Sequence, residues 1–320
     1  MTTEVTTLSA DQTPLFPIAP AAKARRRLAE FFTAELRSDN TRRAYLNAAK
    51  KFSAWCGENG LGLSSIETVH VAAYLKHLQA AGKSVPTIKQ HLAGLRHLFD
   101  HLVTGQIIVI NPAAAVRGPR YSVQEGKTPI LNGDEARRLL ESIPTDTLIG
   151  KRDRALIGLL LYTAARVKAA ISLKVEDYYS EGASWHVRLQ EKGGKAHTVP
   201  CHHRLQEYMA AYIEAAGIAS DSKGPLFRTL RGGAKTLRNR NLLTQSNAYE
   251  LIQRYKVVAG IKTEIGCHSM RGTAITNILE NGASVEEAQN FAGHASPRTT
   301  QLYDRRDQQV RRGLVERIRF

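Results

Sequence analysis

The sequence predicts a mainly α protein with a small antiparallel β-sheet, arranged in two domains. Hydrophobic residues recur at helical spacing along most of the chain, whereas the alternation typical of strands is clear only in residues 184–201. A segment with Pro, Gly and Ser and without a hydrophobic period separates two helical regions near residue 120. The 320 residues are long for one typical domain and sufficient for two, each with its own core.

The first predicted domain, residues 22–118, is helical. The preceding residues 1–21 are rich in Thr, Ala and Pro without periodicity, which is typical of a flexible tail. A helix is predicted from Asp39, where "SDNT" offers several N-cap residues, and further helices are predicted over 65–82 and 84–103. The apolar stripe of the first of these helices consists of Tyr45, Ala48, Phe52 and Trp55. Helices joined by short turns, with no strand signal between them, indicate a small helical bundle.

Residues 119–129 are predicted to be a linker, and residues 130–320 the second domain. Helical patterns restart after the linker. In "SWHVRLQEKGGKAHTVPC" apolar residues alternate on both sides of a Gly-Gly pair, which predicts a β-hairpin. The tip of this hairpin carries Lys192 and Lys195. The remainder is again mostly helical, so this domain is expected to be mixed α/β.

The charge balance is the first functional signal. The chain has 45 Lys and Arg against 29 Asp and Glu, a net charge of +16. Residues 22–118 alone hold 14 basic and 6 acidic residues. Such a surplus suits a polyanion, so DNA or RNA is the expected partner and an anionic membrane the weaker alternative. The candidate DNA contacts are Arg42, Arg43, Lys50, Lys51, Lys89, Arg96 and Lys195, although for any one of them taken alone a solvated surface position is the favoured explanation.

Several function classes are disfavoured. No run reaches the roughly 18 apolar residues that a membrane span needs, and the N-terminus lacks the pattern of a secretory signal. The cysteines Cys56, Cys201 and Cys267 are too scattered for a disulfide framework, so a reduced, cytoplasmic setting is expected. There is no nucleotide-binding Gly-rich loop, and "CHH" at 201–203 has no second ligand pair at zinc-finger spacing. We expect no cofactor and no metal site.

Some residues could serve phosphate chemistry, although each also has a plain structural explanation. Arg166 follows a long apolar run, and a buried arginine needs a fixed anionic partner, either a carboxylate or a phosphate. "CHSMRGTA" places His268 and Arg271 three residues apart, on one face if helical. Taken alone, His294 could fill a loop and Tyr303 could be a core residue with a satisfied hydroxyl.

The order of these residues is more specific than any one of them. An Arg, a hairpin Lys, an HxxR pair, a Gly-His and a Tyr nine residues after that His resemble the tyrosine recombinase (phage integrase) family. The resemblance is strongest between "KRDRALIGLLLYTAARV" and "QLYDRR" and extends to the helical first region. It implies a SAM-like core-binding domain followed by a tyrosine recombinase catalytic domain. The catalytic residues that it implies are Arg166, Lys192, His268, Arg271, His294 and the nucleophile Tyr303.

The implied reaction cuts and rejoins DNA through a 3′-phosphotyrosyl intermediate and a Holliday junction, without metal or ATP. His268 is the expected general base, the two arginines and His294 hold the phosphate, and Lys192 or its neighbour Lys195 protonates the leaving oxygen. One position departs from the family pattern. Many members carry an acidic residue three positions after the first Arg, whereas this chain has Ala169 there, and "AAR" stands in place of the usual "GLR".

The resemblance also implies partners: double-stranded DNA with short inverted-repeat core sites, and a homo-tetramer on two such sites joined through the C-terminal helix. Docking of that helix within its own chain is the alternative. About 20 residues precede the helical domain, which favours a simple recombinase over one that also binds distant arm sites. Integration or excision of a mobile element is the expected task, with multimer resolution and inversion left open. A type IB topoisomerase and a catalytically silent DNA-binding protein are the other classes.

Overall fold

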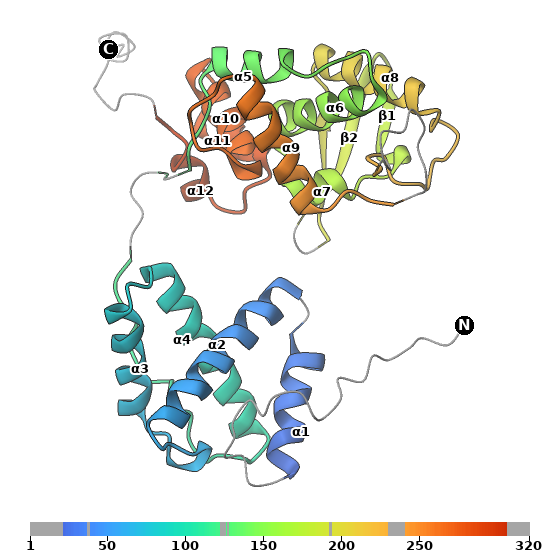
Figure 1. Cartoon of the computed structure of the whole chain (residues 1–320). Coiled ribbons are helices and arrows are strands. Elements are labelled where there is room, and N and C mark those ends of the chain that lie inside the picture. The colour runs from blue at the N-terminus through green and yellow to red at the C-terminus, as the bar shows by residue number, and fades with distance from the viewer. Residues whose placement is uncertain are drawn as a thin grey trace, which may run out of the picture. The chain divides into compact units, whose positions relative to one another are not determined.

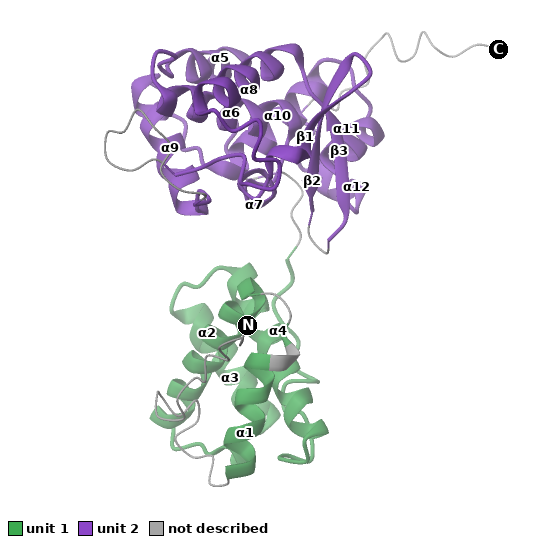
Figure 2. Cartoon of the chain, turned by 90° about the vertical axis from the view of Figure 1, so that its right-hand side faces the viewer, with its two compact units in different colours: residues 1–122 green, residues 123–320 purple. Residues whose placement is uncertain are grey.

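The computed structural model describes residues 22–36, 39–121, 126, 128–191, 194–229 and 241–305. The chain forms two compact units, Met1–Ser122 and Val123–Phe320 (Figure 2). Outside the described residues lie the predicted tail over 1–21, residues 122–125 and 127 of the predicted linker, Lys192 and the segment 306–320. The fold class is confirmed, since the described elements are helices and one small antiparallel sheet (Figure 1).

The first unit is all helical, as predicted. Its elements are α1 (Ala22–Glu30), the π-helical turn η1 (Phe31–Glu35), α2 (Asp39–Glu58), the 3-10 turn η2 (Leu63–Ser65), α3 (Thr68–Ala80) and α4 (Val85–Thr104). The Ser84 side chain caps α4 by accepting a hydrogen bond from the backbone N–H of Thr87. Phe52 from α2, Tyr74 from α3 and Phe99 from α4 meet in the core. The helices α1 and η1 were not predicted.

The second unit places helices around a three-stranded sheet. Its elements are α5 (Gly133–Glu141), α6 (Leu148–Thr163), α7 (Val167–Ile171), η3 (Val175–Asp177), β1 (Tyr178–Glu181), β2 (Ser184–Gln190), β3 (Ala196–Pro200), α8 (His203–Ala216), α9 (Gln245–Val258), α10 (Cys267–Glu280), α11 (Val285–Ala292) and α12 (Pro297–Gln301). The strands are antiparallel in the order β1-β2-β3, and Val187 lies opposite both Tyr178 and Val199. The predicted hairpin is thus confirmed, whereas β1, which is short and polar, was not predicted.

Helix α6 is the centre of this unit and positions the candidate site. It packs against α8 and α10, and its apolar run from Ala155 to Leu160 is buried. The helix ends at Ala164, which adopts a left-handed conformation with φ 51°. A non-glycine residue in this region costs free energy, so the surrounding contacts must fix it. Two residues later the chain reaches Arg166, the residue that precedes α7.

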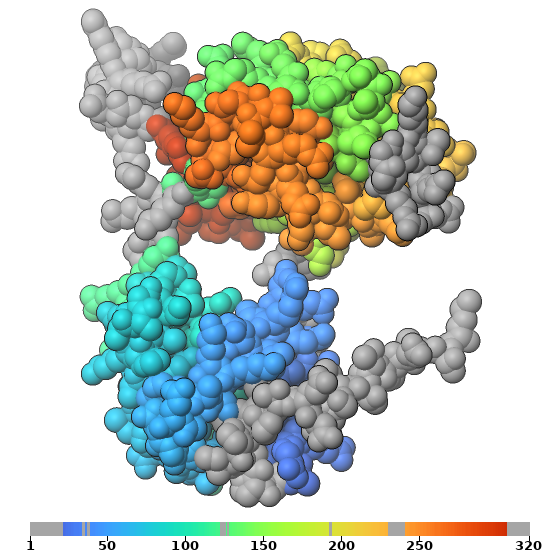
Figure 3. All heavy atoms as spheres, viewed as in Figure 1, coloured from blue at the N-terminus to red at the C-terminus, as the bar shows by residue number. Residues whose placement is uncertain are grey.

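The surface helix α9 shows that exposed apolar groups are present but scattered. In the space-filling view α9 covers part of one face of the second unit (Figure 3). Tyr249, Val257 and Val258 are exposed on it. Isolated exposed apolar side chains are common on globular proteins, so they do not mark a site by themselves. Among the helices of the described residues, none is long and apolar enough to cross a membrane.

Candidate active site

Tyr303 lies against His268 at the end of the described chain. The Tyr303 hydroxyl is 2.8 Å from Nε2 of His268, the second residue of α10. Tyr303 follows α12 and is buried, and its backbone carbonyl accepts a hydrogen bond from the hydroxyl of Thr276, about two turns further along α10. The tyrosine is therefore held at both its backbone and its phenol by the same helix.

Arg271 is the buried arginine of this site. Only 2% of the residue is exposed, and its guanidinium donates to the backbone carbonyls of Ala164 and Ala292, the latter at 2.6 Å. These carbonyls terminate α6 and α11 and have no partner within their own helices. Arg271 thus joins the ends of two helices, and its charge acts on His268 and Tyr303.

His294 is the second histidine beside the Tyr303 ring. The two rings are nearly parallel, with centroids 6.1 Å apart and an interplanar angle of 13°. Nδ1 of His294 is 2.8 Å from the hydroxyl of the buried Thr300. The preceding Gly293 ends α11 with φ +60°, and a Cβ there would lie 3.3 Å from the His197 ring. Glycine therefore suits both the backbone and the space at this position.

Arg166 completes the part of the cluster that the structure describes. Its side chain is 40% exposed and pairs through Nη1 with Oε2 of Glu191, a residue at the start of the hairpin tip. The backbone N–H of Glu191 donates to the carbonyl of Lys195 at 2.8 Å, which closes the tip. Lys195 is exposed, and Lys192 lies outside the described residues. Five of the six predicted catalytic residues are thus placed, and they gather at one site.

The environment shifts the pKa values of these groups. Burial lowers the pKa of His268, and the nearby charges of Arg271 and Arg166 lower it further. Burial, helped by the same arginines, lowers the pKa of His294 to about 4. Burial also lowers the pKa of Arg271 to about 10. Burial raises the pKa of the Tyr303 phenol, against the opposing effects of Arg271, a Thr128 hydrogen bond and Arg166. At neutral pH both imidazoles are neutral and the phenol is protonated.

The basic candidates of the first unit have different surroundings. Lys50, Lys51 and Lys89 are exposed, as is Arg43, which bonds to Asn40. Arg42 is partly buried, pairs with Asp39 and donates to the carbonyl of Leu36. Arg96 donates to the carbonyls of Ala113 and Val116. The guanidinium of Arg96 therefore fastens the segment after α4, whereas the lysines are free to meet a polyanion.

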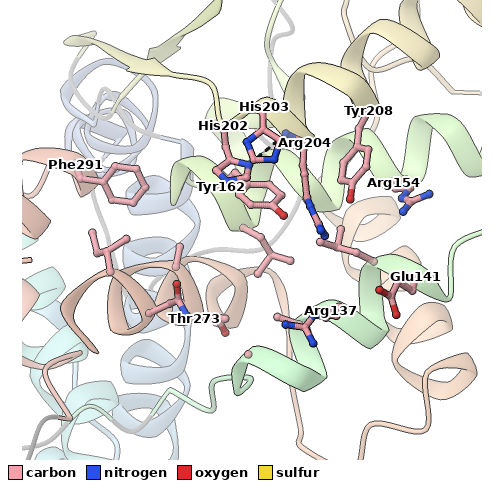
Figure 4. A pocket seen from close by; sticks show the side chains of 17 residues that line it. Arg137, Glu141, Arg154, Tyr162, His202, His203, Arg204, Tyr208, Thr273 and Phe291 are labelled. Atoms are coloured by element: carbon pink, nitrogen blue, oxygen red, sulfur yellow. Dashed lines mark hydrogen bonds between the residues drawn. The ribbon is translucent and has the colours of Figure 1, made fainter. Parts of the chain in front are cut away.

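A cavity of about 630 Å³ lies elsewhere in the second unit. Residues of α5, α6, α8, α10 and α11 line it, and its labelled side chains include Tyr162, His202, Arg204 and Phe291 (Figure 4). None of the five placed catalytic candidates lines it. The candidate site is instead a cluster around a tyrosine next to partly exposed Arg166, which suits a macromolecular substrate better than an enclosed small molecule. No group of three or more His, Cys, Asp or Glu in the described parts of the chain is arranged to hold a metal ion.

Sequence reasoning did not identify three partners of these residues: Glu191, Thr300 and Thr128. Each contacts a predicted site residue from a different segment, and none belongs to a recognisable spacing. For Glu191 the sequence offered one indirect signal, because a buried arginine such as Arg166 needs an anionic partner. This signal does not say which carboxylate is the partner.

Comparison with known proteins decides the family. Residues 129–309 match the phage integrase family, and residues 25–108 match the SAM-like N-terminal domain of phage integrases. The chain belongs to the phage integrase family. Curated relatives of this integrase include a tyrosine recombinase XerD of Chlorobaculum tepidum, 26% identical over 83% of this chain and 86% of the relative. Another XerD, of Oceanobacillus iheyensis, is 29% identical over 83% of this chain and 87% of the relative.

Solved structures share the fold of this integrase. XerH site-specific recombinase in a post-cleavage complex with a palindromic difH substrate matches with a TM-score of 0.67 and 20% identity, over 90% of this chain and 92% of that chain. A lambda integrase tetramer bound to a Holliday junction matches with a TM-score of 0.66 and 18% identity, over 90% and 79% of the two chains. The integrase is therefore a tyrosine recombinase of the XerD and integrase type, a DNA strand-transferring enzyme.

Proposed function

We propose that this integrase is a site-specific recombinase in which Tyr303 forms the covalent bond to DNA. The observation that carries the proposal is the 2.8 Å contact between the Tyr303 hydroxyl and Nε2 of His268, next to two arginines. Phosphotyrosyl chemistry needs a phenol, a group to accept its proton and cations to hold a phosphate. All of these are present in one cluster.

The cleavage step begins with the phenol. As the Tyr303 oxygen bonds to the scissile phosphorus, its proton passes to Nε2 of the neutral His268. The raised pKa of the phenol keeps it protonated until a phosphate arrives. Arg166 and Arg271 can then hold the non-bridging oxygens with charge-assisted hydrogen bonds. A neutral His294 whose Nδ1 accepts from Thr300 carries its proton on Nε2, where it can donate to the same phosphate.

The second half of the step releases the 5′ oxygen. The bond between phosphorus and this oxygen breaks, and a lysine of the hairpin tip supplies the proton that turns it into a hydroxyl. Lys192 is the proposed donor, and Lys195 is the alternative. The phosphotyrosyl bond conserves the energy of the phosphodiester, so a 5′ hydroxyl from another strand can reverse the reaction without ATP.

The first prediction concerns the nucleophile. Tyr303→Phe removes only the hydroxyl and should abolish covalent attachment while DNA affinity changes by less than about threefold. The measurement is incubation with a suicide duplex that carries the candidate site, followed by a denaturing gel and mapping of the DNA-linked peptide. Tyr249→Phe, a change at an exposed tyrosine of α9, is the matched control and should leave attachment intact. Adduct formation by Tyr303→Phe would contradict the assignment.

The lysine roles need a chemically altered substrate. Lys192→Ala should slow cleavage by roughly 10²-fold or more, because general acid catalysis contributes on that order. A duplex with a 5′-bridging sulfur has a leaving group that needs no proton, and it should restore cleavage by Lys192→Ala. If the 5′-bridging sulfur restored cleavage by Lys195→Ala and not by Lys192→Ala, Lys195 would be the proton donor instead.

The proposed partner is double-stranded DNA with short inverted-repeat core sites, on which four copies assemble through their C-terminal segments. We propose integration or excision of a mobile element as the task, and resolution of multimers as the alternative. A plasmid with two sites in direct repeat, compared with one linear and one circular partner, distinguishes them. Resolution favours the first substrate, and integration requires the second.

A further inference from the structure

The anionic partner of Arg166 does not come from its own helix. Position 169, three residues after Arg166 on the short helix α7, is a buried alanine with 4% exposure and offers no carboxylate. A half-buried guanidinium without a fixed partner would sample several rotamers and would lose part of its ability to orient a phosphate.

The hairpin supplies the missing carboxylate. The Glu191 side chain is only 6% exposed, and its Oε2 pairs with Nη1 of Arg166 from a position 25 residues later in the chain. Its second oxygen, Oε1, is buried and has no hydrogen-bond partner among the described residues. Burying a carboxylate is costly unless a cation compensates it, so this glutamate is held inward by Arg166.

We propose that Glu191 is a positioning residue, which orients Arg166 for the scissile phosphate and anchors the hairpin tip that carries the candidate general acid. The inference rests on the proposed function of the cluster. The Glu191 carboxylate would then connect two parts of the candidate site, namely Arg166 after α6 and the hairpin tip between β2 and β3.

The pairing is compatible with phosphate binding. A guanidinium has five N–H donors, and the contact with Glu191 uses Nη1. The Arg166 side chain keeps 40% of its surface exposed, so the remaining donors can reach a DNA phosphate. The hairpin has a second contact with the rest of the unit that does not involve Glu191, because Nε2 of His197 on β3 is 2.9 Å from the carbonyl of Phe291 on α11.

The experiment measures single-turnover cleavage of a suicide duplex by the full chain. Glu191→Gln should slow cleavage roughly 10-fold and Glu191→Ala roughly 100-fold, the scale expected when a phosphate-binding group is misplaced by about 1 Å. Wild-type protein must form the Tyr303 adduct in the same assay. An absent wild-type adduct refutes the proposed function, whereas a wild-type adduct with unchanged rates in both variants refutes only the role of Glu191.

Two readouts separate positioning from simple loss of structure. Adding Glu191→Ala to Arg166→Ala should not slow cleavage further, since the glutamate acts through that arginine. On a methylphosphonate duplex whose methyl group replaces the oxygen held by Arg166, the 100-fold loss of Glu191→Ala should shrink to within about threefold. Additive losses, or an equal loss on both substrates, would overturn the proposal. Glu176→Gln, which removes a carboxylate that pairs with Lys223, is the matched control and should cleave at the wild-type rate.

Discussion

At the residue scale, Tyr303 and His268 face each other with pKa values shifted away from each other. Burial raises the pKa of the phenol and lowers that of the imidazole, and the arginines lower both. Proton transfer between them is therefore unfavourable in the free protein. In the proposed cleavage step the transfer accompanies the attack on phosphorus, because a phenol oxygen that bonds to phosphorus loses its affinity for the proton. The raised pKa of the phenol therefore keeps the proposed nucleophile protonated in the free protein.

The pH dependence of cleavage follows from the shift at His268. Its base form is lost as the pH falls through its folded pKa, which lies below the ordinary value of 6.5. The rate should therefore be level near neutrality and decline only on the acidic side of pH 6.5, as measured by single-turnover cleavage at saturating DNA. Replacement by Gln should slow cleavage by roughly 10² to 10⁴-fold and remove this acid limb. An acid limb centred above pH 7 would contradict His268 as the base.

At the element scale, the close approach of α10 to Tyr303 depends on Gly272. A Cβ at this position would lie 2.9 Å from Cγ2 of Ile130 and 3.1 Å from the Tyr303 ring. Both contacts are tighter than side chains normally adopt, so a larger residue must displace the tyrosine or the Ile130 segment. Helix α10 thus supplies both the HxxR residues and the flat surface against which the tyrosine packs.

Gly272→Ala should consequently slow cleavage roughly tenfold, because the phenol moves away from its aligned position. The free energy of unfolding should fall by about 1 kcal/mol, since overpacking costs about 1–3 kcal/mol and the better helix propensity of Ala returns up to about 1 kcal/mol. Cleavage kinetics and thermal melting check both effects. Gly133→Ala in α5 is the control, because a Cβ there meets nothing within 4 Å. Equal behaviour of the two variants would contradict the packing argument.

At the scale of the whole molecule, the net charge of +16 is distributed over both units. A basic helical unit and a basic catalytic unit, joined by a linker, can each contribute phosphate contacts. Each such contact releases counterions, so affinity should fall steeply with salt. The exposed Lys50 and Lys51 on α2 are the candidate contacts of the first unit.

The double variant Lys50→Ala, Lys51→Ala should lower the slope of log affinity against log salt by about 2, since each phosphate contact contributes about 0.9. Fluorescence anisotropy titrations over a series of salt concentrations measure it. The cleavage rate at saturating DNA should remain unchanged, because neither lysine belongs to the catalytic cluster. Lys76→Ala on α3 is the single-charge control. A slope equal to that of the wild type would show that Lys50 and Lys51 on α2 do not contact phosphates of the DNA.

Much of the fold follows from local sequence. The stripe from Tyr45 to Trp55 and the Ser84 cap define helices by themselves, and the Gly-Gly pair between alternating strands defines the hairpin. The elements α1 and β1 were missed for local reasons too: α1 is a short, strongly basic helix, and β1 is four mostly polar residues paired with β2. Their stability comes from the neighbours that they pack against, which periodicity does not reveal.

The sequence by itself determined the order of an Arg, a hairpin Lys, an HxxR pair, a Gly-His and a Tyr, and with it the family. Only the tertiary structure decided which partners hold these residues. Arg271 donates hydrogen bonds to the carbonyls of Ala164 and Ala292, and Arg166 pairs with Glu191 instead of with a carboxylate at position 169. The physical reason is that spacing along one helix or hairpin is a local property. Burial, charge pairing and pKa shifts arise where segments 21 to 142 residues apart pack together, and these contacts leave no periodic signal in the sequence.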